Sequence, residues 1–242
     1  MTDQKTHRLQ INPRMTVRDL ADYMAASETA QRTVVRDCRF QARARVIQHD
    51  EAKSTVSKFI RDKDTDVGWL YEEAARIRER MADSSFERDL FDHNAYYIQR
   101  FADIWPGIAN KMPGTPSALG KVPGIVLHGV RISMDLHIRL SRVDRKNKSK
   151  AGGVMLRYAK NVPLRQDVAD WQSAFLFGYL RNTLTPEESE PELGLCLTLD
   201  AFAGKWYPAP TNSISRFNQM KSACATIAER WPNVKPPPNA IY

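Results

Sequence analysis

The chain has 242 residues, 42% of them hydrophobic and 26% charged, which is ordinary for a soluble globular protein. Its 36 Lys and Arg exceed its 28 Asp and Glu by a net charge of +8, which favours an anionic partner such as nucleic acid. No apolar run approaches the roughly 20 residues of a membrane span, the first residues lack the apolar stretch of a secretory signal, and the three cysteines are too dispersed for a disulfide framework. We therefore expect a cytoplasmic protein with no membrane partner.

Residues 1–104 are expected to form a helical region. Thr16 is a good N-cap, with Asp19 three positions later, and it opens a first helix. The spacing of apolar residues predicts further helices at about 29–49, 51–61, 67–81 and 86–104. The helix at 29–49 has an apolar stripe beside a basic stripe, and the basic stripe consists of Arg32, Arg36, Arg39 and Arg43.

Residues 16–41 are similar to a helix-turn-helix motif. Leu20 falls in the first helix, Ala26 falls at the turn, and Arg32 and Arg36 fall in the would-be recognition helix. The resemblance implies that this second helix enters the major groove of DNA. Ala26 stands in the region where a glycine is often found, so a plain helical hairpin and a dimerisation element stay open as alternatives.

The chain changes character at residues 105–124, which contain four prolines and four glycines. We interpret this stretch as a long connection to an α/β sheet domain at residues 125–242. In that domain the patterns predict strands at about 125–140, 153–160 and 193–200, with the first two joined by a polar turn as an antiparallel hairpin, and helices at 164–184 and 214–231. The expected fold class is α+β or α/β, with a helical N-terminal region followed by a small mixed sheet flanked by helices.

Residues 130–140, VRISMDLHIRL, alternate between apolar and polar side chains without a break. A period of two predicts a strand with one face on the core. The other face carries Arg131, Asp135, His137 and Arg139. That face is interpreted as a solvated surface, a phosphate-binding surface or a catalytic site, and the pattern alone does not choose among them.

The predicted order of strand, strand, helix, strand, helix resembles the core of the PD-(D/E)XK, or restriction-endonuclease-like, nuclease superfamily. The resemblance implies that Asp135 binds Mg²⁺ and that Lys160, at the end of the second strand, is the catalytic lysine, with the metal activating water at a phosphate. The superfamily places an acid two positions before that lysine, where this chain has Tyr158. Gln172 and Tyr179 on the next helix are similar to a pair found in the RecB-type branch.

Because Tyr158 cannot replace a carboxylate ligand, we expect a catalytically impaired centre that needs no cofactor. Residues 139–165 hold nine Lys and Arg against one acid, which favours binding of phosphate. The expected partner is nucleic acid, DNA in preference to RNA. Besides the basic stripe, the candidate nucleic-acid-binding residues are Arg131, Arg139, Lys146, Lys148, Arg157 and Lys160.

Two alternatives stay open. The first is an active Mg²⁺-dependent nuclease that uses Asp135, Lys160 and an acid displaced to another element, for which the candidates are Glu72, Glu73, Asp167 and Asp170. The second is a protein–protein adaptor, or a homodimer, whose basic surface meets an acidic partner.

Overall fold

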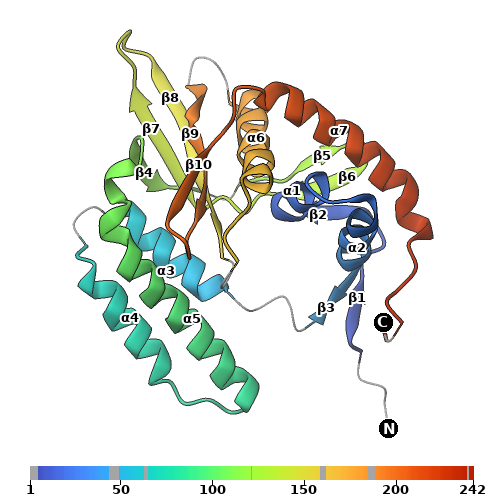
Figure 1. The fold of residues 1–242 in the computed structure, drawn as a ribbon, viewed down its shortest axis with the longest axis horizontal. Helices are drawn as coiled ribbons and strands as arrows, with labels where there is room; N and C mark the ends of the chain where they lie inside the picture. Colours follow the sequence, from blue (N-terminus) through green and yellow to red (C-terminus); the bar gives the residue numbers. More distant parts are fainter. Residues whose placement is uncertain are drawn as a thin grey trace.

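The computed structural model describes residues 5–43, 49–62, 65–120, 122–158, 162–184, 189–238 and 240–242. It is a mixed α/β structure in which helices flank several sheets (Figure 1), as the expected fold class requires. Among the described helices, none combines the length and the hydropathy of a membrane span.

The first part of the chain is mainly helical. Its elements are β1 (His7–Leu9), β2 (Arg14–Thr16), α1 (Val17–Met24), α2 (Glu28–Arg39), β3 (Phe40–Ala42), α3 (Asp50–Arg61), α4 (Gly68–Arg78) and α5 (Ser85–Ile104). Thr16 caps α1 as predicted: its hydroxyl accepts a hydrogen bond from the Asp19 N–H at 3.1 Å, and the Asp19 carboxylate accepts one from the Thr16 N–H at 3.1 Å. The two groups satisfy N–H groups that the first helical turn leaves without a partner.

The helix predicted at 29–49 is shorter than expected. It ends at Arg39, and residues 40–42 form β3, which pairs antiparallel with β1. Phe40 is buried and packs against the ring of Tyr242, with ring centroids 5.2 Å apart. Pairing with a strand distant in sequence therefore outweighs the local helical pattern. Residues 44–48 lie outside the described residues.

The second part of the chain contains the larger sheet. Its elements are β4 (Thr115–Ala118), β5 (Ile125–Leu127), β6 (Val130–Ser133), β7 (Ile138–Val143), β8 (Ser149–Arg157), α6 (Gln166–Thr183), β9 (Glu190–Asp200), β10 (Lys205–Pro208) and α7 (Ser213–Arg230), with 3₁₀ turns at Trp105–Gly107, Ala109–Lys111 and Trp231–Asn233. The stretch 105–124 is thus more than a connection. It contributes β4, an edge strand, and an edge is where a strand tolerates proline.

The strands form a five-stranded sheet of order β10-β9-β8-β7-β4, a three-stranded sheet of order β2-β6-β5, and the pair β1-β3. The predicted antiparallel hairpin is confirmed as β7–β8, whereas β8 and β9 are parallel and are connected through α6. Gly152 lies at the register shift between β8 and β9. A Cβ atom there would come within 2.1 Å of the Leu195 carbonyl oxygen, so the close pairing of these strands requires glycine.

The prediction of one strand over residues 125–140 is wrong, because β5, β6 and β7 are separate strands within that span. β6 ends at Ser133 and β7 begins at Ile138, and the two strands belong to different sheets. Ile132 is buried in a core with α6 and α7, whereas Ile138 is buried in a core with α3 and α5. The alternation correctly indicates strand structure before residue 134 and after residue 137, but the chain crosses from one core to the other between them. Asp135 and His137 therefore lie in that crossing and not on a sheet face.

The two largest cores both combine residues from before and after the stretch 105–124. In the first core, Leu20 and Val35 from the first part of the chain lie with Phe175 and Trp231. In the second, helices α3, α4 and α5 cover β7, β8 and β9. The first and second parts of the chain therefore pack against each other in both cores.

Candidate functional site

Asp135 lies between a lysine and a histidine. Its Oδ2 atom is 2.7 Å from Lys53 Nζ of α3, and its Oδ1 atom is 3.1 Å from His137 Nε2. Lys53 Nζ is also 4.0 Å from the carboxylate of Asp50 at the start of α3. The Lys53 side chain is 17% exposed, and that of His137 is 21% exposed. Each carboxylate oxygen of Asp135 therefore faces a nitrogen atom of the chain itself.

These neighbours determine the charge of Asp135. Burial by itself would raise the pKa of Asp135, but the hydrogen bonds and charges of His137 and Lys53 outweigh burial and hold that pKa well below its ordinary value. Asp135 is consequently ionised at neutral pH, with a lysine ammonium in direct contact.

Aromatic side chains lie near Asp135 in the interior of the protein. Tyr158 directly follows β8 and is 4% exposed, and its hydroxyl has no hydrogen-bond partner in the described part of the chain. The rings of Tyr97 and Tyr158 are 5.1 Å apart, and the His49 ring is 4.6 Å from that of Tyr97. Burial and, less strongly, the charge of Arg18 lower the pKa of His49 to about 4, which leaves it neutral at physiological pH. Burial, followed by the charge of Asp135, raises the pKa of Tyr158.

The acids considered as displaced metal ligands do not join Asp135. Glu73 pairs with Arg76 on α4, Asp167 pairs with Arg165, Asp170 lies 3.6 Å from Arg216, and Glu72 is exposed on α4. Among the described residues, no three His, Cys, Asp or Glu side chains are grouped to hold a metal ion. Lys160 lies outside the described residues.

The two residues that resemble the RecB-type pair are both buried in α6. The Tyr179 hydroxyl donates to the carbonyl of Pro123 at 2.9 Å, and Gln172 is 3% exposed. The Tyr179 hydroxyl thus bonds to the backbone of a segment 56 residues earlier, a contact that the sequence pattern does not indicate.

Arg157, a candidate phosphate ligand, is inside the protein. Its side chain is 8% exposed, and its Nη2 atom lies 2.6 Å from Asp22 Oδ1 of α1. Burial lowers the pKa of Arg157, and the charge of Asp22 opposes that shift. Arg157 thus connects β8 to α1, and a phosphate would have to displace Asp22 to reach it.

The basic block on the β7–β8 hairpin is partly neutralised by acids from β9. Arg142 pairs with Glu192, Lys148 lies 3.2 Å from Glu190, and Lys150 pairs with Glu190. A count of charges along residues 139–165 misses these pairs, because the acids follow in sequence and reach the hairpin only through the sheet.

Three exposed hairpin cations, Arg139, Arg145 and Lys146, have no ion pair within the described part of the chain, and the hairpin projects from the body of the molecule (Figure 1). Arg131 is exposed on β6, in register with Arg14 of β2. We call Arg131, Arg139, Arg145 and Lys146 the exposed cation set.

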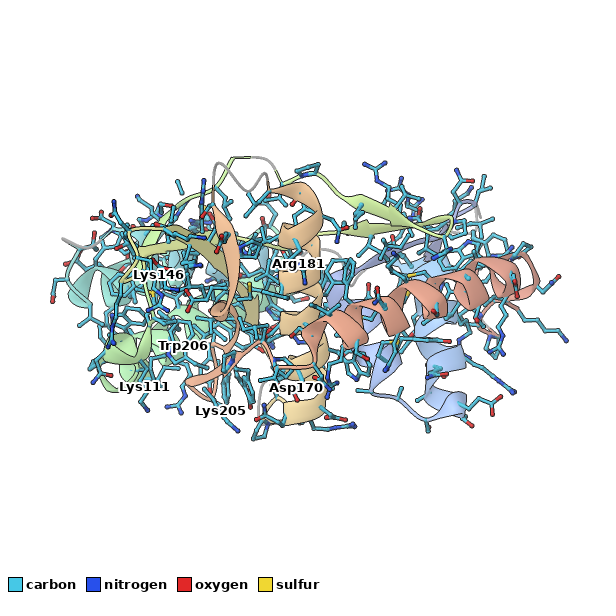
Figure 2. All side chains as sticks on the ribbon, turned by 90° about the horizontal axis from the view of Figure 1, so that it is seen from above. Lys111, Lys146, Asp170, Arg181, Lys205 and Trp206 are labelled. Carbon is cyan, nitrogen blue, oxygen red and sulfur yellow. The ribbon has the colours of Figure 1, made fainter. Side chains whose placement is uncertain are left out.

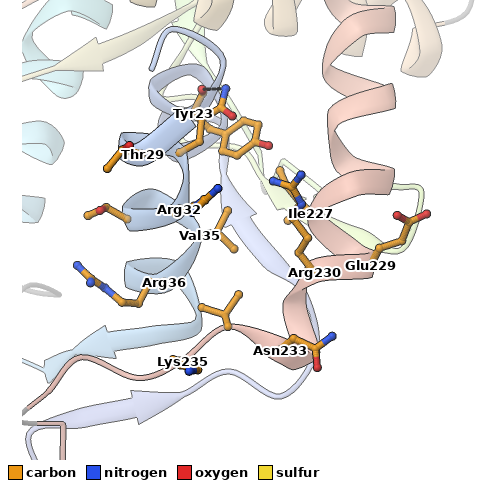
Figure 3. Close-up of a pocket in the computed structure, with 13 residues that line it drawn as sticks. Tyr23, Thr29, Arg32, Val35, Arg36, Ile227, Glu229, Arg230, Asn233 and Lys235 are labelled. Carbon is orange, nitrogen blue, oxygen red and sulfur yellow. Dashed lines mark hydrogen bonds between the residues drawn. The ribbon is translucent and has the colours of Figure 1, made fainter. Parts of the chain in front are cut away.

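The four arginines of the basic stripe lie in different surroundings. Arg39 donates to the Trp231 carbonyl and lies over the Phe40 ring, so it contributes to packing. Arg43 is exposed beyond the end of α2. Arg32 and Arg36 line a groove of about 740 Å³ between α2 and α7 (Figure 3). α1 and α2 form a helical pair joined by residues 25–27 (Figure 1), an arrangement that a helix-turn-helix motif and a plain helical hairpin share.

A scan of the chain against models of protein families finds no match, and a search of curated proteins finds none either.

Proposed function

We propose that this protein binds nucleic acid, DNA in preference to RNA, on a PD-(D/E)XK-like core that does not cut it. The observation that supports this most strongly is the occupation of both Asp135 oxygens by Lys53 and His137. Mg²⁺ prefers several oxygen ligands, including carboxylates, and a carboxylate already neutralised by an ammonium group is a weak ligand. At the position where the superfamily has its second acid, the buried phenol of Tyr158 adds no negative charge.

The order of the elements supports the same proposal. β7 and β8 are antiparallel, α6 follows, and β9 is parallel to β8, which agrees with the order that the resemblance implies. Asp135 precedes β7 and Tyr158 follows β8, so the two residues meet at one end of the sheet. Asp135 and Tyr158 therefore lie at the same end of the sheet, but Tyr158 does not supply the negative charge of the acid that the superfamily has at that position.

Binding is assigned to the exposed cation set. These four side chains are free to replace the counterions of a phosphate backbone, and such contacts provide most of the sequence-independent affinity of DNA-binding proteins. Lys148 contributes less than its charge suggests, because Glu190 is 3.2 Å away and repels phosphate. The net charge of +8 adds long-range attraction.

Neutralising the hairpin cations is expected to weaken DNA binding and to reduce its salt dependence. In the triple variant Arg139→Gln, Arg145→Gln, Lys146→Gln, each lost phosphate contact reduces the slope of log affinity against log salt by about 0.9. The measurement is fluorescence anisotropy of a labelled duplex in EDTA over a series of KCl concentrations.

The matched control removes the same charge from other elements. Lys111, Arg181 and Lys205 are exposed and lie on the second 3₁₀ turn, α6 and β10, and Figure 2 labels them together with Lys146. Their triple glutamine variant is expected to change the slope by less than half as much as the hairpin variant does. Equal slopes for the two variants would refute the assignment of binding to the hairpin.

A further inference from the structure

The groove between α2 and α7 has cations on both walls. Arg32 and Arg36 come from α2, Arg230 comes from the end of α7 on the opposite wall, and Lys235 lies beyond α7, where the chain passes below the end of α2 (Figure 3). Glu229 is the one acid among the groove-lining residues that the structure describes. Cations that face each other across a hollow surface concentrate their field within it, so the groove attracts an anion.

The four cations are accessible to such an anion. Arg32, Arg230 and Lys235 are exposed, whereas Arg36 is half-buried and its Nε atom lies 3.6 Å from Asp37 Oδ1. The ion pair of Arg32 with Glu28 is on the surface, with both side chains more than 70% exposed. A pair of this kind contributes at most about 1 kcal/mol, so an anionic ligand can displace it.

The rest of the groove lining suits a ligand that has apolar and hydrogen-bonding parts in addition to its anionic group. Val35, Ile227 and Val234 supply an apolar floor, and Asn233 supplies an amide at one end. At the other end, the Gln31 amide donates to the Tyr23 carbonyl at 3.1 Å, which leaves its oxygen as an acceptor. The volume of about 740 Å³ lies in the range of sites for small organic ligands.

We propose that this groove binds a nucleoside phosphate. The apolar floor accommodates the ring and the sugar, an amide at one end of the groove bonds to a polar edge of the base, and the arginines bind the phosphates in the forked geometry that guanidinium groups favour. The ligand is either a free nucleotide or the phosphorylated end of a nucleic-acid strand. The site is separate from the exposed cation set.

The test is isothermal titration calorimetry of the full chain in EDTA with three probes: ATP, a single-stranded oligonucleotide with a 5′-phosphate, and the same oligonucleotide with a 5′-hydroxyl. The double variant Arg32→Gln, Arg230→Gln is expected to weaken binding at least about tenfold, since it removes two charge-assisted contacts. A second double variant, Arg36→Gln with Lys235→Gln, is expected to give a smaller but measurable loss, because Arg36 is half-buried and paired with Asp37. Lys221→Gln, on α7 but outside the groove, is the matched control and is expected to bind as the original chain does.

The probes separate the two sources of the ligand. Binding of ATP without a preference for the 5′-phosphate identifies a free nucleotide, and a preference for the phosphorylated strand identifies a strand end. The proposal is overturned if neither ATP nor the 5′-phosphorylated oligonucleotide binds, or if both double variants bind as tightly as Lys221→Gln. The hairpin triple variant is expected to retain ATP binding, so failure of this proposal is distinguishable from failure of the proposed DNA surface.

Discussion

Replacing Asp22 with alanine is expected to lower the free energy of unfolding by about 3 kcal/mol, because it leaves the buried guanidinium of Arg157 without its carboxylate. The Arg157 side chain is 8% exposed, and one of its terminal nitrogens already has no hydrogen-bond partner in the described part of the chain. Breaking a buried pair costs about 3–5 kcal/mol, and the lower end applies here because Asp22 is 35% exposed. In a chain of this length the melting temperature should fall by about 6–12 °C.

Urea denaturation of two further variants tests the cause of this loss. Asp92→Ala removes an acid from an exposed pair with Arg88, and it is expected to cost less than about 1 kcal/mol. The double variant Asp22→Ala, Arg157→Met removes both charges and should recover part of the stability. The account is contradicted if Asp22→Ala destabilises the protein no more than Asp92→Ala does.

Replacing Asp135 with alanine is expected to lower the free energy of unfolding by about 2 kcal/mol, with no loss of DNA binding. Lys53 would keep its largely buried position but lose the carboxylate at 2.7 Å, leaving Asp50 at 4.0 Å. An uncompensated charge in a partly buried position is costly. Urea denaturation measures the loss, and the double variant Asp135→Ala, Lys53→Met should recover part of it.

The same variants distinguish a structural carboxylate from a metal ligand. A metal that binds only the folded state raises its stability in proportion to the logarithm of the metal concentration. We expect millimolar Mg²⁺ to leave the melting temperature of the original chain and of Asp135→Ala equally unchanged. An increase seen in the original chain alone would mean that Asp135 binds the metal.

The features that could be predicted from the sequence are those with local causes. The Thr16 cap is correct because its partner, Asp19, is three residues away. The helices at 51–61, 67–81 and 86–104 have close counterparts in α3, α4 and α5, since each has an apolar stripe at helical spacing. The β7–β8 hairpin follows from two strand patterns separated by a polar turn.

The features that could not be predicted depend on pairing between distant segments. The alternation at residues 130–140 is the same for one long strand and for two short strands in different sheets. Lys53 is 82 residues from Asp135, and nothing in its own helix indicates that partner. Glu190 and Glu192 neutralise the basic block only because β9 lies parallel to β8. Residue type alone indicates Glu72, Glu73, Asp167 and Asp170 as candidate ligands, whereas their distance from Asp135 depends on the topology of the fold.

The most direct test of the account is retention and cleavage of labelled linear DNA by the original chain, measured in EDTA and in Mg²⁺ over a series of salt concentrations. We predict retention that survives EDTA, weakens steeply as salt rises, and leaves the DNA intact in Mg²⁺. Mg²⁺-dependent cutting that Asp135→Ala abolishes would contradict the account, and so would the absence of any retention at low salt, which would favour an acidic protein partner.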